Sequence, residues 1–193
     1  MDVVEQERRG ALAAAAGALE KLGVPYFLFG ANAQNVWGDP RSTTDADFVF
    51  FLSDERFGEA LTRLSDAGFS VQPERHHERI RVNRMTKLRF REFAVDFVLG
   101  ETEFDRMAAT RARKVEYLGT SIPVVSPEDL ILYKLIAHRS RDLADIENVI
   151  RRQRDVLDRA HLRKWARWLA RNTGMRRIVT TLGRMLRSFG KRR

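Results

Sequence analysis

The hydrophobic positions of this chain fall into two patterns, short apolar runs of strand length and longer stretches with helical spacing. The apolar runs predict strands over residues 26–29, 45–52, 69–71, 79–82, 88–91, 93–99, 114–117 and 122–125. The helical spacing predicts helices over residues 3–22, 32–37, 54–67, 103–110, 127–138, 141–154, 158–171 and 174–189. Ser126 followed by Pro127 and two acids is typical of a helix start.

Aspartates interrupt two of these apolar strands. Asp45 and Asp47 are two positions apart in strand 45–52, so they point to the same face and lie about 6.6 Å apart along the strand. Asp96 stands within the apolar strand 93–99. Like charges beside apolar residues are costly unless a cation compensates them, and Mg²⁺ prefers carboxylate oxygens together with substrate phosphates. The alternative interpretation is that Asp45 and Asp47 are solvated turn residues at the mouth of the strand.

His76 and His77 are further candidate metal ligands, in a polar passage that follows Pro73. Adjacent residues of an extended segment point to opposite faces, so the two imidazoles do not converge on one ion. We therefore interpret this passage as a solvated loop that leads into the edge strand 79–82.

Two segments resemble motifs of a known enzyme superfamily. Residues 30–47, from Gly-Ala-Asn-Ala to Thr-Thr-Asp-Ala-Asp, are similar to the signature of the polymerase-β-like nucleotidyltransferases, closest to the AbiEii-type toxin nucleotidyltransferases and their small relatives. Ala31 departs from the family's Gly or Ser and offers the triphosphate only its backbone N–H. Residues 132–146 are similar to the family's Lys…Arg-x-Arg-x-Lys-Asp-x-x-Asp pattern, with Arg141 where Lys is common.

The resemblance implies a fold class and a division of the chain. The expected fold is α+β, with a mixed sheet flanked by helices and a C-terminal helical bundle. A nucleotidyltransferase catalytic domain is expected at residues 1–126, followed by a helical, strongly basic region at residues 127–193.

The resemblance also implies the roles of individual residues. Asp45, Asp47 and Asp96 are expected to be catalytic and to bind two Mg²⁺ (or Mn²⁺) ions, with Asp96 also the general base for the attacking hydroxyl. Lys134 is expected to be catalytic and to reach the nucleotide phosphates, with Asp142 and Asp145 supporting the site. The expected nucleotide-binding residues are Gly30, Ala31, Arg41, Thr44, Lys134 and Arg141.

Charge is distributed unevenly along the chain, whose formal net charge is +9. Residues 151–193 contain 15 Lys or Arg against two acids, a local net charge of +13, whereas residues 1–150 carry −4. We interpret the basic region 151–193 as an RNA-binding surface. The alternative is a solvated Arg-rich helical face. Trp165 and Trp168 in this region are interpreted as core residues rather than base-stacking platforms.

The composition excludes several other classes of chemistry. The chain has no cysteine, which excludes disulfides, thiolate metal sites and cysteine nucleophiles and fits a reducing cytoplasm. Acidic residues stand where a signal peptide would carry basic ones, and no apolar run approaches the roughly 20 residues of a membrane span. We therefore expect a cytoplasmic protein that does not bind membranes.

The function implied by the resemblance is metal-dependent transfer of NMP from an NTP to a hydroxyl acceptor. RNA with a tRNA-like end is the leading acceptor, and the family implies a toxin role with an antitoxin protein as a partner. Two alternatives stay open, a small-molecule (antibiotic) nucleotidyltransferase and a catalytically inactive module that binds nucleotide or RNA.

Overall fold

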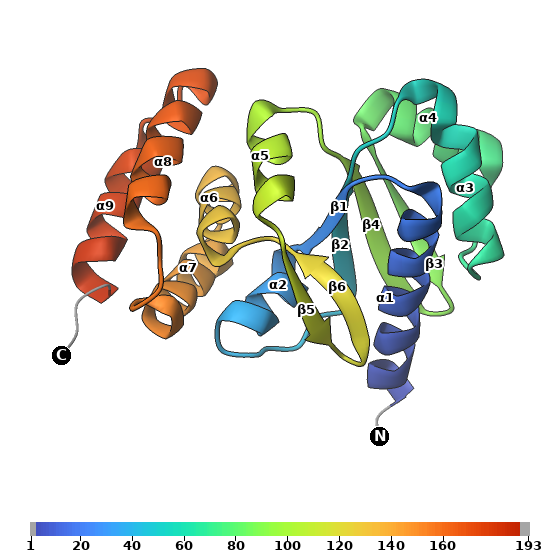
Figure 1. The fold of residues 1–193 in the computed structure, drawn as a ribbon, viewed down its shortest axis with the longest axis horizontal. Helices are drawn as coiled ribbons and strands as arrows, with labels where there is room; N and C mark the ends of the chain where they lie inside the picture. The colour runs from blue at the N-terminus through green and yellow to red at the C-terminus, as the bar shows by residue number, and fades with distance from the viewer. Residues whose placement is uncertain (1–2, 190–193) are drawn as a thin grey trace. The chain divides into compact units, whose positions relative to one another are not determined.

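The computed structural model describes residues 3–189, in which helices and strands alternate before an all-helical C-terminal part (Figure 1). The elements are α1 (Val3–Leu22), β1 (Tyr26–Phe29), α2 (Gly30–Trp37), β2 (Asp45–Phe50), η1 (Asp54–Arg56), α3 (Phe57–Asp66), α4 (Pro73–Asn83), β3 (Met85–Phe90), β4 (Phe93–Leu99), α5 (Glu103–Arg111), β5 (Arg113–Tyr117), β6 (Thr120–Val124), α6 (Pro127–Ala137), α7 (Ser140–Gln153), α8 (Arg159–Thr173) and α9 (Arg177–Phe189).

Six strands of the described chain form one mixed sheet in the order β3-β4-β2-β1-β6-β5. Strand β2 runs antiparallel to β1 and parallel to β4, and β3 pairs antiparallel with β4 at one edge. Strands β5 and β6 form an antiparallel hairpin, which joins the sheet through parallel pairing of β6 with β1. The fold is therefore α+β, as predicted.

The central strands have one apolar face and one polar face. Phe48 of β2 and Phe97 of β4 are fully buried, and their rings stack with centroids 6.0 Å apart. Helix α1 packs across β2, β3, β4 and β6, and Gly10 of this helix lies against the ring of Phe90. Because residues alternate faces along a strand, Asp47 and Asp96 stand on the face opposite to the buried rings.

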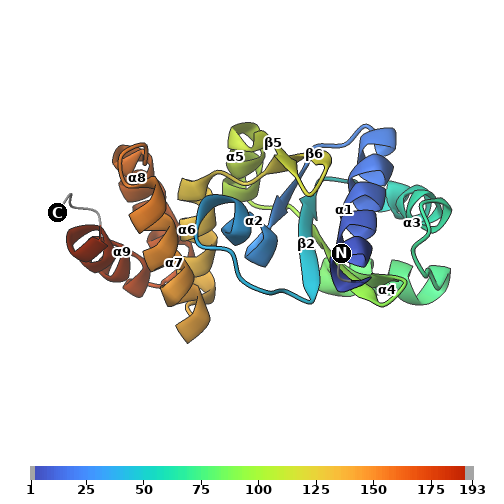
Figure 2. The same ribbon diagram turned by 90° about the horizontal axis from the view of Figure 1, so that it is seen from below.

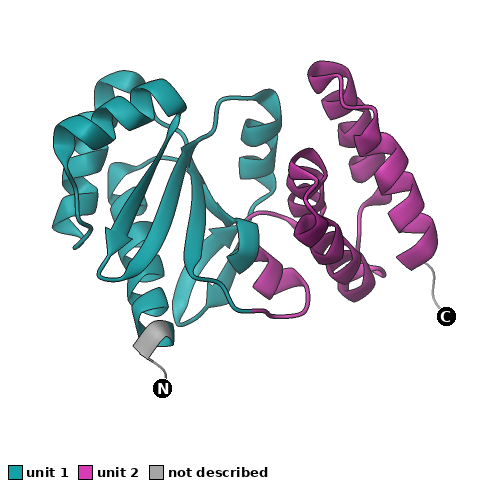
Figure 3. Cartoon of the chain, turned by 180° about the vertical axis from the view of Figure 1, so that it is seen from behind, with its two compact units in different colours: residues 1–32, 42–124 teal, residues 33–41, 125–193 magenta. Residues whose placement is uncertain are grey.

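The chain forms two compact units (Figure 3). Unit 1 contains Met1–Asn32 and Ser42–Val124, and unit 2 contains Ala33–Arg41 and Val125–Arg193. The short segment Ala33–Arg41 is tied to the rest of unit 2 by Trp37, whose indole N–H donates a hydrogen bond of 2.7 Å to the carbonyl of Val125.

Helices α8 and α9 lie side by side within unit 2 (Figures 1 and 2). Both are amphipathic as predicted, with these apolar side chains buried: Leu162, Trp165, Leu169, Ile178, Leu182, Met185 and Leu186. Trp165 is therefore a core residue, and Trp168 packs beside it with ring centroids 5.2 Å apart. No helix within residues 3–189 combines the length and the apolar composition that crossing a bilayer requires.

The prediction for residues 73–82 is wrong. They form no loop and edge strand but lie in helix α4, where Pro73 occupies the first turn. His76 and Ile80 stand one helical turn apart and are both buried. The Nδ1 atom of His76 accepts a hydrogen bond from the backbone N–H of Gln72, and burial together with the nearby charges of Arg75 and Arg79 lowers the pKa of His76. Its imidazole therefore caps the start of its own helix.

Two smaller expectations also differ from the structure. The expected strand 69–71 is reduced to a single bridge between Ser70 and Arg89. The expected helix 54–67 is split into the 3-10 turn η1 and helix α3. For residues 69–71, the extent of the strand depends on the neighbouring backbone, which pairs only at Ser70.

Gly17, in the second half of α1, provides a test of the helix. A Cβ added to Gly17 would meet no atom within 4 Å. We expect Gly17→Ala to raise the free energy of unfolding by about 0.5–1 kcal/mol, because Ala loses less backbone entropy than Gly in a helix. Urea unfolding followed by circular dichroism measures the change. Gly10→Ala is the contrasting variant, since its Cβ would lie 3.0 Å from the Phe90 ring. A Gly17→Ala protein less stable than the parent would contradict the prediction.

Candidate functional site

Three neighbouring strands place Lys87, Asp96 and Asp47 in one row across the sheet. The register pairs Lys87 of β3 with Asp96 of β4, and Asp96 with Asp47 of β2. Directly paired residues point to the same face, and Asp45 stands two residues before Asp47 on that face. The structure thus brings the three predicted carboxylates together on the polar side of the sheet.

Asp96 is the most buried of these carboxylates, with 8% of its surface exposed. Its Oδ2 atom accepts from Lys87 Nζ at 3.0 Å, and its buried Oδ1 atom has no hydrogen-bond partner among the described residues. The hydrogen bond with Asp96 raises the pKa of Lys87, with a further contribution from the charges of Asp45 and Asp47. Lys87 is therefore a counter-cation of the carboxylates. The sequence analysis missed it because only the strand register reveals its position.

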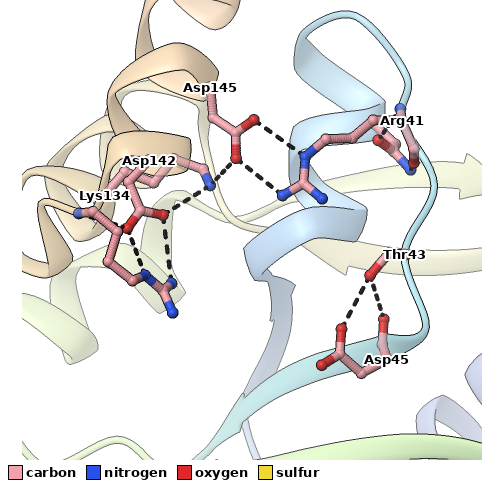
Figure 4. Close-up of polar contacts among 8 residues, drawn as sticks. Arg41, Thr43, Asp45, Lys134, Asp142 and Asp145 are labelled. Atoms are coloured by element: carbon pink, nitrogen blue, oxygen red, sulfur yellow. Dashed lines mark hydrogen bonds and ion pairs between the residues drawn. The ribbon is translucent and has the colours of Figure 1, made fainter.

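The start of β2 is held by hydrogen bonds around Asp45. The hydroxyl of Thr43 donates to the Oδ1 atom of Asp45 at 3.0 Å, as Figure 4 shows, and the side-chain amide of Asn32 donates to its backbone carbonyl at 2.9 Å. Thr44, an expected nucleotide-binding residue, is exposed and forms no side-chain hydrogen bond with the described residues. Within the Thr-Thr pair, Thr43 is thus the residue that orients the first carboxylate.

Gly30 leaves room for the second carboxylate. A Cβ at this position would lie 2.0 Å from Asp47 Oδ2, closer than any two such atoms can approach. The φ angle of Gly30 is +65°, in the left-handed region that favours glycine. Gly30 is therefore required by both space and backbone conformation, whereas Ala31, the next residue, is partly exposed at the start of α2.

Unit 2 holds a second polar cluster, which we call the lysine–aspartate cluster (Lys134, Asp142, Asp145, Arg41 and Arg139) (Figure 4). Lys134 Nζ lies 2.6 Å from Asp145 Oδ2 and 3.6 Å from Asp142 Oδ1. Arg41 donates to both oxygens of Asp145, from Nε at 3.2 Å and from Nη2 at 3.1 Å. The cluster contains three cations and two carboxylates, which leaves it with a net positive charge.

Three members of the lysine–aspartate cluster are almost completely buried. The side chains of Lys134, Asp142 and Asp145 are 7%, 4% and 4% exposed. Burial by itself would raise the pKa of Asp142, but hydrogen bonds from Arg139 and the charge of Lys134 lower it overall. The ammonium group of Lys134 donates a hydrogen bond to Asp145 and forms a longer ion pair with Asp142. Its expected contact with nucleotide phosphates stays a prediction.

The last of the expected nucleotide-binding residues lies apart from these contacts. Arg141 is exposed on α7, and it forms no ion pair with any residue that the structure describes. Its neighbour Asp142 is buried and paired with Arg139 Nε at 2.8 Å. The matched Arg-Asp dipeptide therefore contributes its carboxylate, not its guanidinium, to the lysine–aspartate cluster.

The carboxylate row fits a divalent ion that is bound together with a substrate. Asp45, Asp47 and Asp96 would supply oxygen ligands, and the buried Oδ1 atom of Asp96 has no hydrogen-bond partner among the described residues. Across residues 3–189, no group of three or more acidic or histidine side chains is gathered tightly enough to hold an ion by itself. Mg²⁺ commonly uses one or two carboxylates and completes its shell with water and phosphate oxygens, which these residues allow.

Comparison with known proteins places this geometry in context. The model of a family described as nucleotidyl transferase AbiEii toxin, type IV toxin–antitoxin system, matches residues 26–183. The solution structure of the antibiotic-resistance factor ANT(2'')-Ia is 12% identical and has a TM-score of 0.51, covering 93% of this chain and 91% of its own. No curated protein sequence matches the chain.

Two other solved structures have lower TM-scores. The lincosamide antibiotic adenylyltransferase LnuA, bound to lincomycin, is 17% identical over 72% of this chain and 94% of its own, with a TM-score of 0.48. A tRNA nucleotidyltransferase solved with a primer tRNA and an ATP analogue is 14% identical over 91% of this chain and 60% of its own, with a TM-score of 0.33. Of the structures compared, ANT(2'')-Ia supports the fold alone, because its sequence identity is low.

Gly30→Ala tests the close approach of Asp47 to the helix start. We expect it to lower the free energy of unfolding by at least about 1–2 kcal/mol, because an L-residue in the left-handed region is strained and its Cβ would overlap the carboxylate. Gly17→Ala, the same substitution in open space, is the matched control and should act in the opposite direction. Two variants of equal stability in urea would show that Gly30 has no special role.

Lys134→Met tests the lysine–aspartate cluster. We expect this variant to be about 1–3 kcal/mol less stable, because the buried carboxylates of Asp142 and Asp145 lose the ammonium group between them and keep only Arg139 and Arg41 as partners. Arg141→Met, on an exposed side chain of the next helix, should change stability by less than about 0.5 kcal/mol. Equilibrium urea unfolding of both proteins gives the comparison. If Lys134→Met is as stable as Arg141→Met, the cluster does not contribute to folding.

Proposed function

The chain belongs to the AbiEii nucleotidyl transferase toxin family, and from that premise we propose that it transfers a nucleoside monophosphate from an NTP to a hydroxyl group of an RNA. The observation that carries the proposal is the direct pairing of Asp47 with Asp96 across β2 and β4, with Asp45 on the same face. Carboxylates on one polar face, next to a glycine that keeps the backbone close, suit the handling of a triphosphate.

The proposed reaction is an in-line displacement at the α-phosphorus. The acceptor oxygen forms a bond to this phosphorus, the bond from it to the oxygen shared with the β-phosphate breaks, and pyrophosphate leaves. Asp96 takes the proton of the attacking hydroxyl as general base. Its buried Oδ1 atom, which lacks a partner among the described residues, supports this assignment.

Binding residues complete the proposal. Asp45, Asp47 and Asp96 would hold two Mg²⁺ (or Mn²⁺) ions, which when bound neutralise charge on the attacking and leaving oxygens. We assign contacts with the nucleotide to the residues predicted from the sequence: Gly30, Ala31, Arg41, Thr44, Lys134 and Arg141. Arg41 and Lys134 are the members of this set that neutralise charge on the departing pyrophosphate.

RNA is the proposed acceptor because of the basic region. Arg159, Arg163 and Arg167 are four residues apart on α8 and line a hollow of about 350 Å³ with Arg187 of α9. Closely spaced cations on one face hold phosphodiesters in a salt-dependent way. We therefore assign RNA binding to residues 151–193, of which 190–193 lie outside the described residues, and nucleotidyl transfer to the domain at residues 1–126.

The family description supports a biological setting as well. It concerns a toxin of a type IV toxin–antitoxin system, so we propose that this chain acts as a toxin. Its partners would then be NTP, RNA and an antitoxin protein. We place the reaction in the cytoplasm, in agreement with the absence of cysteine from the sequence.

One incubation separates this proposal from its alternatives. The purified protein is mixed with Mg²⁺, total RNA and each of the four labelled NTPs in turn. Label that appears on RNA supports the proposed function. Label that appears only when an antibiotic such as an aminoglycoside is supplied would favour an antibiotic nucleotidyltransferase. Metal-dependent NTP binding without any transfer would favour an inactive binding module.

Asp96→Ala tests the assignment of the general base. We expect transfer to fall by at least about 10²–10⁴-fold, the usual contribution of a positioned proton acceptor, while nucleotide binding persists. Transfer is followed by label on RNA and binding by equilibrium dialysis. Asp66→Ala, at an exposed position on α3, is the control and should keep full activity. Unchanged transfer in Asp96→Ala would rule out this role.

A further inference from the structure

A pocket of about 900 Å³ lies within unit 1, beside the carboxylate row. We call it the α4–β3 pocket, and its polar lining includes Arg75, Arg79, Lys87, Arg89 and Asp96. Four of these side chains are cationic, and Asp96 is the single carboxylate among the described residues that line it. The pocket therefore combines the proposed general base with an excess of positive charge.

The two arginines of α4 carry charge that no carboxylate of the pocket compensates. Arg75 and Arg79 are one helical turn apart and therefore share a face of the helix. Arg75 donates to the side-chain oxygen of Gln72 at 3.2 Å, and neither arginine forms an ion pair with any described residue. Arg81 of the same helix differs, because both of its bonds go to Glu78, at 2.9 and 2.8 Å.

The strand side of the pocket is also lined by cations, although both of them have carboxylate partners, Asp96 for Lys87 and Glu92 for Arg89. Lys87 and Arg89 stand two residues apart on edge strand β3 and point to the face that carries Asp96. Lys87 is half-exposed and paired with Asp96, while Arg89 donates to the backbone carbonyl of Glu92 at 2.9 Å. Cations that line a pocket from two elements, with one carboxylate between them, are arranged for a ligand with several negative charges.

We propose that the α4–β3 pocket binds the phosphodiester backbone of the acceptor RNA next to its terminal hydroxyl. The inference rests on the proposed function, because the acceptor hydroxyl must reach Asp96 and this carboxylate lines the pocket. Guanidinium groups bind phosphate oxygens in a bidentate way, which suits Arg75 and Arg79 to hold successive phosphates. The pocket would position the reacting end of the RNA.

The charge of the pocket also selects among acceptors. An aminoglycoside carries several ammonium groups, and four cations around Asp96 would repel it. A single-stranded RNA end brings one negative charge with each phosphate and gains from the same field. The pocket therefore favours a polyanionic acceptor over a cationic antibiotic, independently of the basic region 151–193.

Binding of RNA in the absence of NTP tests the pocket. The full-length protein is titrated into a short, 5′-labelled single-stranded RNA at about 50 to 200 mM salt, and fluorescence anisotropy gives the affinity. We compare the parent with the double variant Arg75→Ala/Arg79→Ala and with the control Arg81→Ala. The slope of log affinity against log salt is negative, and loss of two phosphate contacts should make it less steep by about 1.4, at about 0.7 for each contact.

A reduced salt dependence in the double variant, but not in Arg81→Ala, would support the proposal. The control is expected to bind as the parent does, since Arg81 is paired with Glu78 and does not line the pocket. Equal salt slopes for the double variant and the parent would overturn the proposal, as would an equal loss in the control. Thermal unfolding followed by circular dichroism confirms that the exposed arginines are dispensable for folding.

Photocrosslinking locates the RNA end. RNA that carries a 3′-terminal 4-thiouridine is irradiated with the parent protein, and the crosslinked peptides are identified by mass spectrometry. Crosslinks to peptides from residues 70–96 support the proposal, and crosslinks found solely in residues 151–193 would overturn it. Neither measurement uses nucleotide transfer, so a protein that binds RNA here but transfers no label would refute the proposed function and leave the pocket standing.

Discussion

Like charges on one face of a sheet repel one another, and three aspartates of unit 1 are subject to this constraint. Asp47 and Asp96 are direct neighbours in the register of β2 and β4, so their carboxylates stand on the same face of adjacent strands and repel one another. Lys87, on the adjoining edge strand, partly compensates it through its contact with Asp96. Gly30 has no side chain, and its backbone therefore leaves room for the carboxylate of Asp47. The residual negative charge is what a bound cation would neutralise.

The lysine–aspartate cluster of unit 2 also brings charged side chains close together. Its net charge is positive, and its Lys134, Asp142 and Asp145 side chains are almost completely buried. Its ammonium lies between two nearly inaccessible carboxylates, and arginines approach from two other segments. Such a network is costly to desolvate, so it is maintained by mutual compensation of its members. It also holds Arg41 in place at the end of the short segment Ala33–Arg41. Arg41, which the sequence motif predicts to bind the nucleotide, is thus also paired with Asp145 inside the protein.

The elements that were predicted correctly are those whose signals lie within a few residues. Ser126 accepts a hydrogen bond from the backbone N–H of Asp129 and starts α6 where the cap and Pro127 indicate. The amphipathic faces of α8 and α9 follow from spacing alone, because a helix repeats every 3.6 residues. Helix α4 was missed because a run of polar and basic residues hides the one-turn spacing of His76 and Ile80, and alternation over four residues fits a strand equally well.

By itself, the amino-acid sequence determined the aspartates within apolar strands, the motif around them, the caps and the uneven charge. These are local properties of residue type and spacing. Only the tertiary structure decided that Asp96 stands directly beside Asp47, that Lys87 is the counter-cation, and that α4 and β3 enclose a basic pocket next to Asp96. Strand order and register cause this difference. They join Asp47 to Asp96, 49 positions along the chain, and Lys87 to Asp96, nine positions along it, through the pairing of backbones rather than through a pattern of side chains.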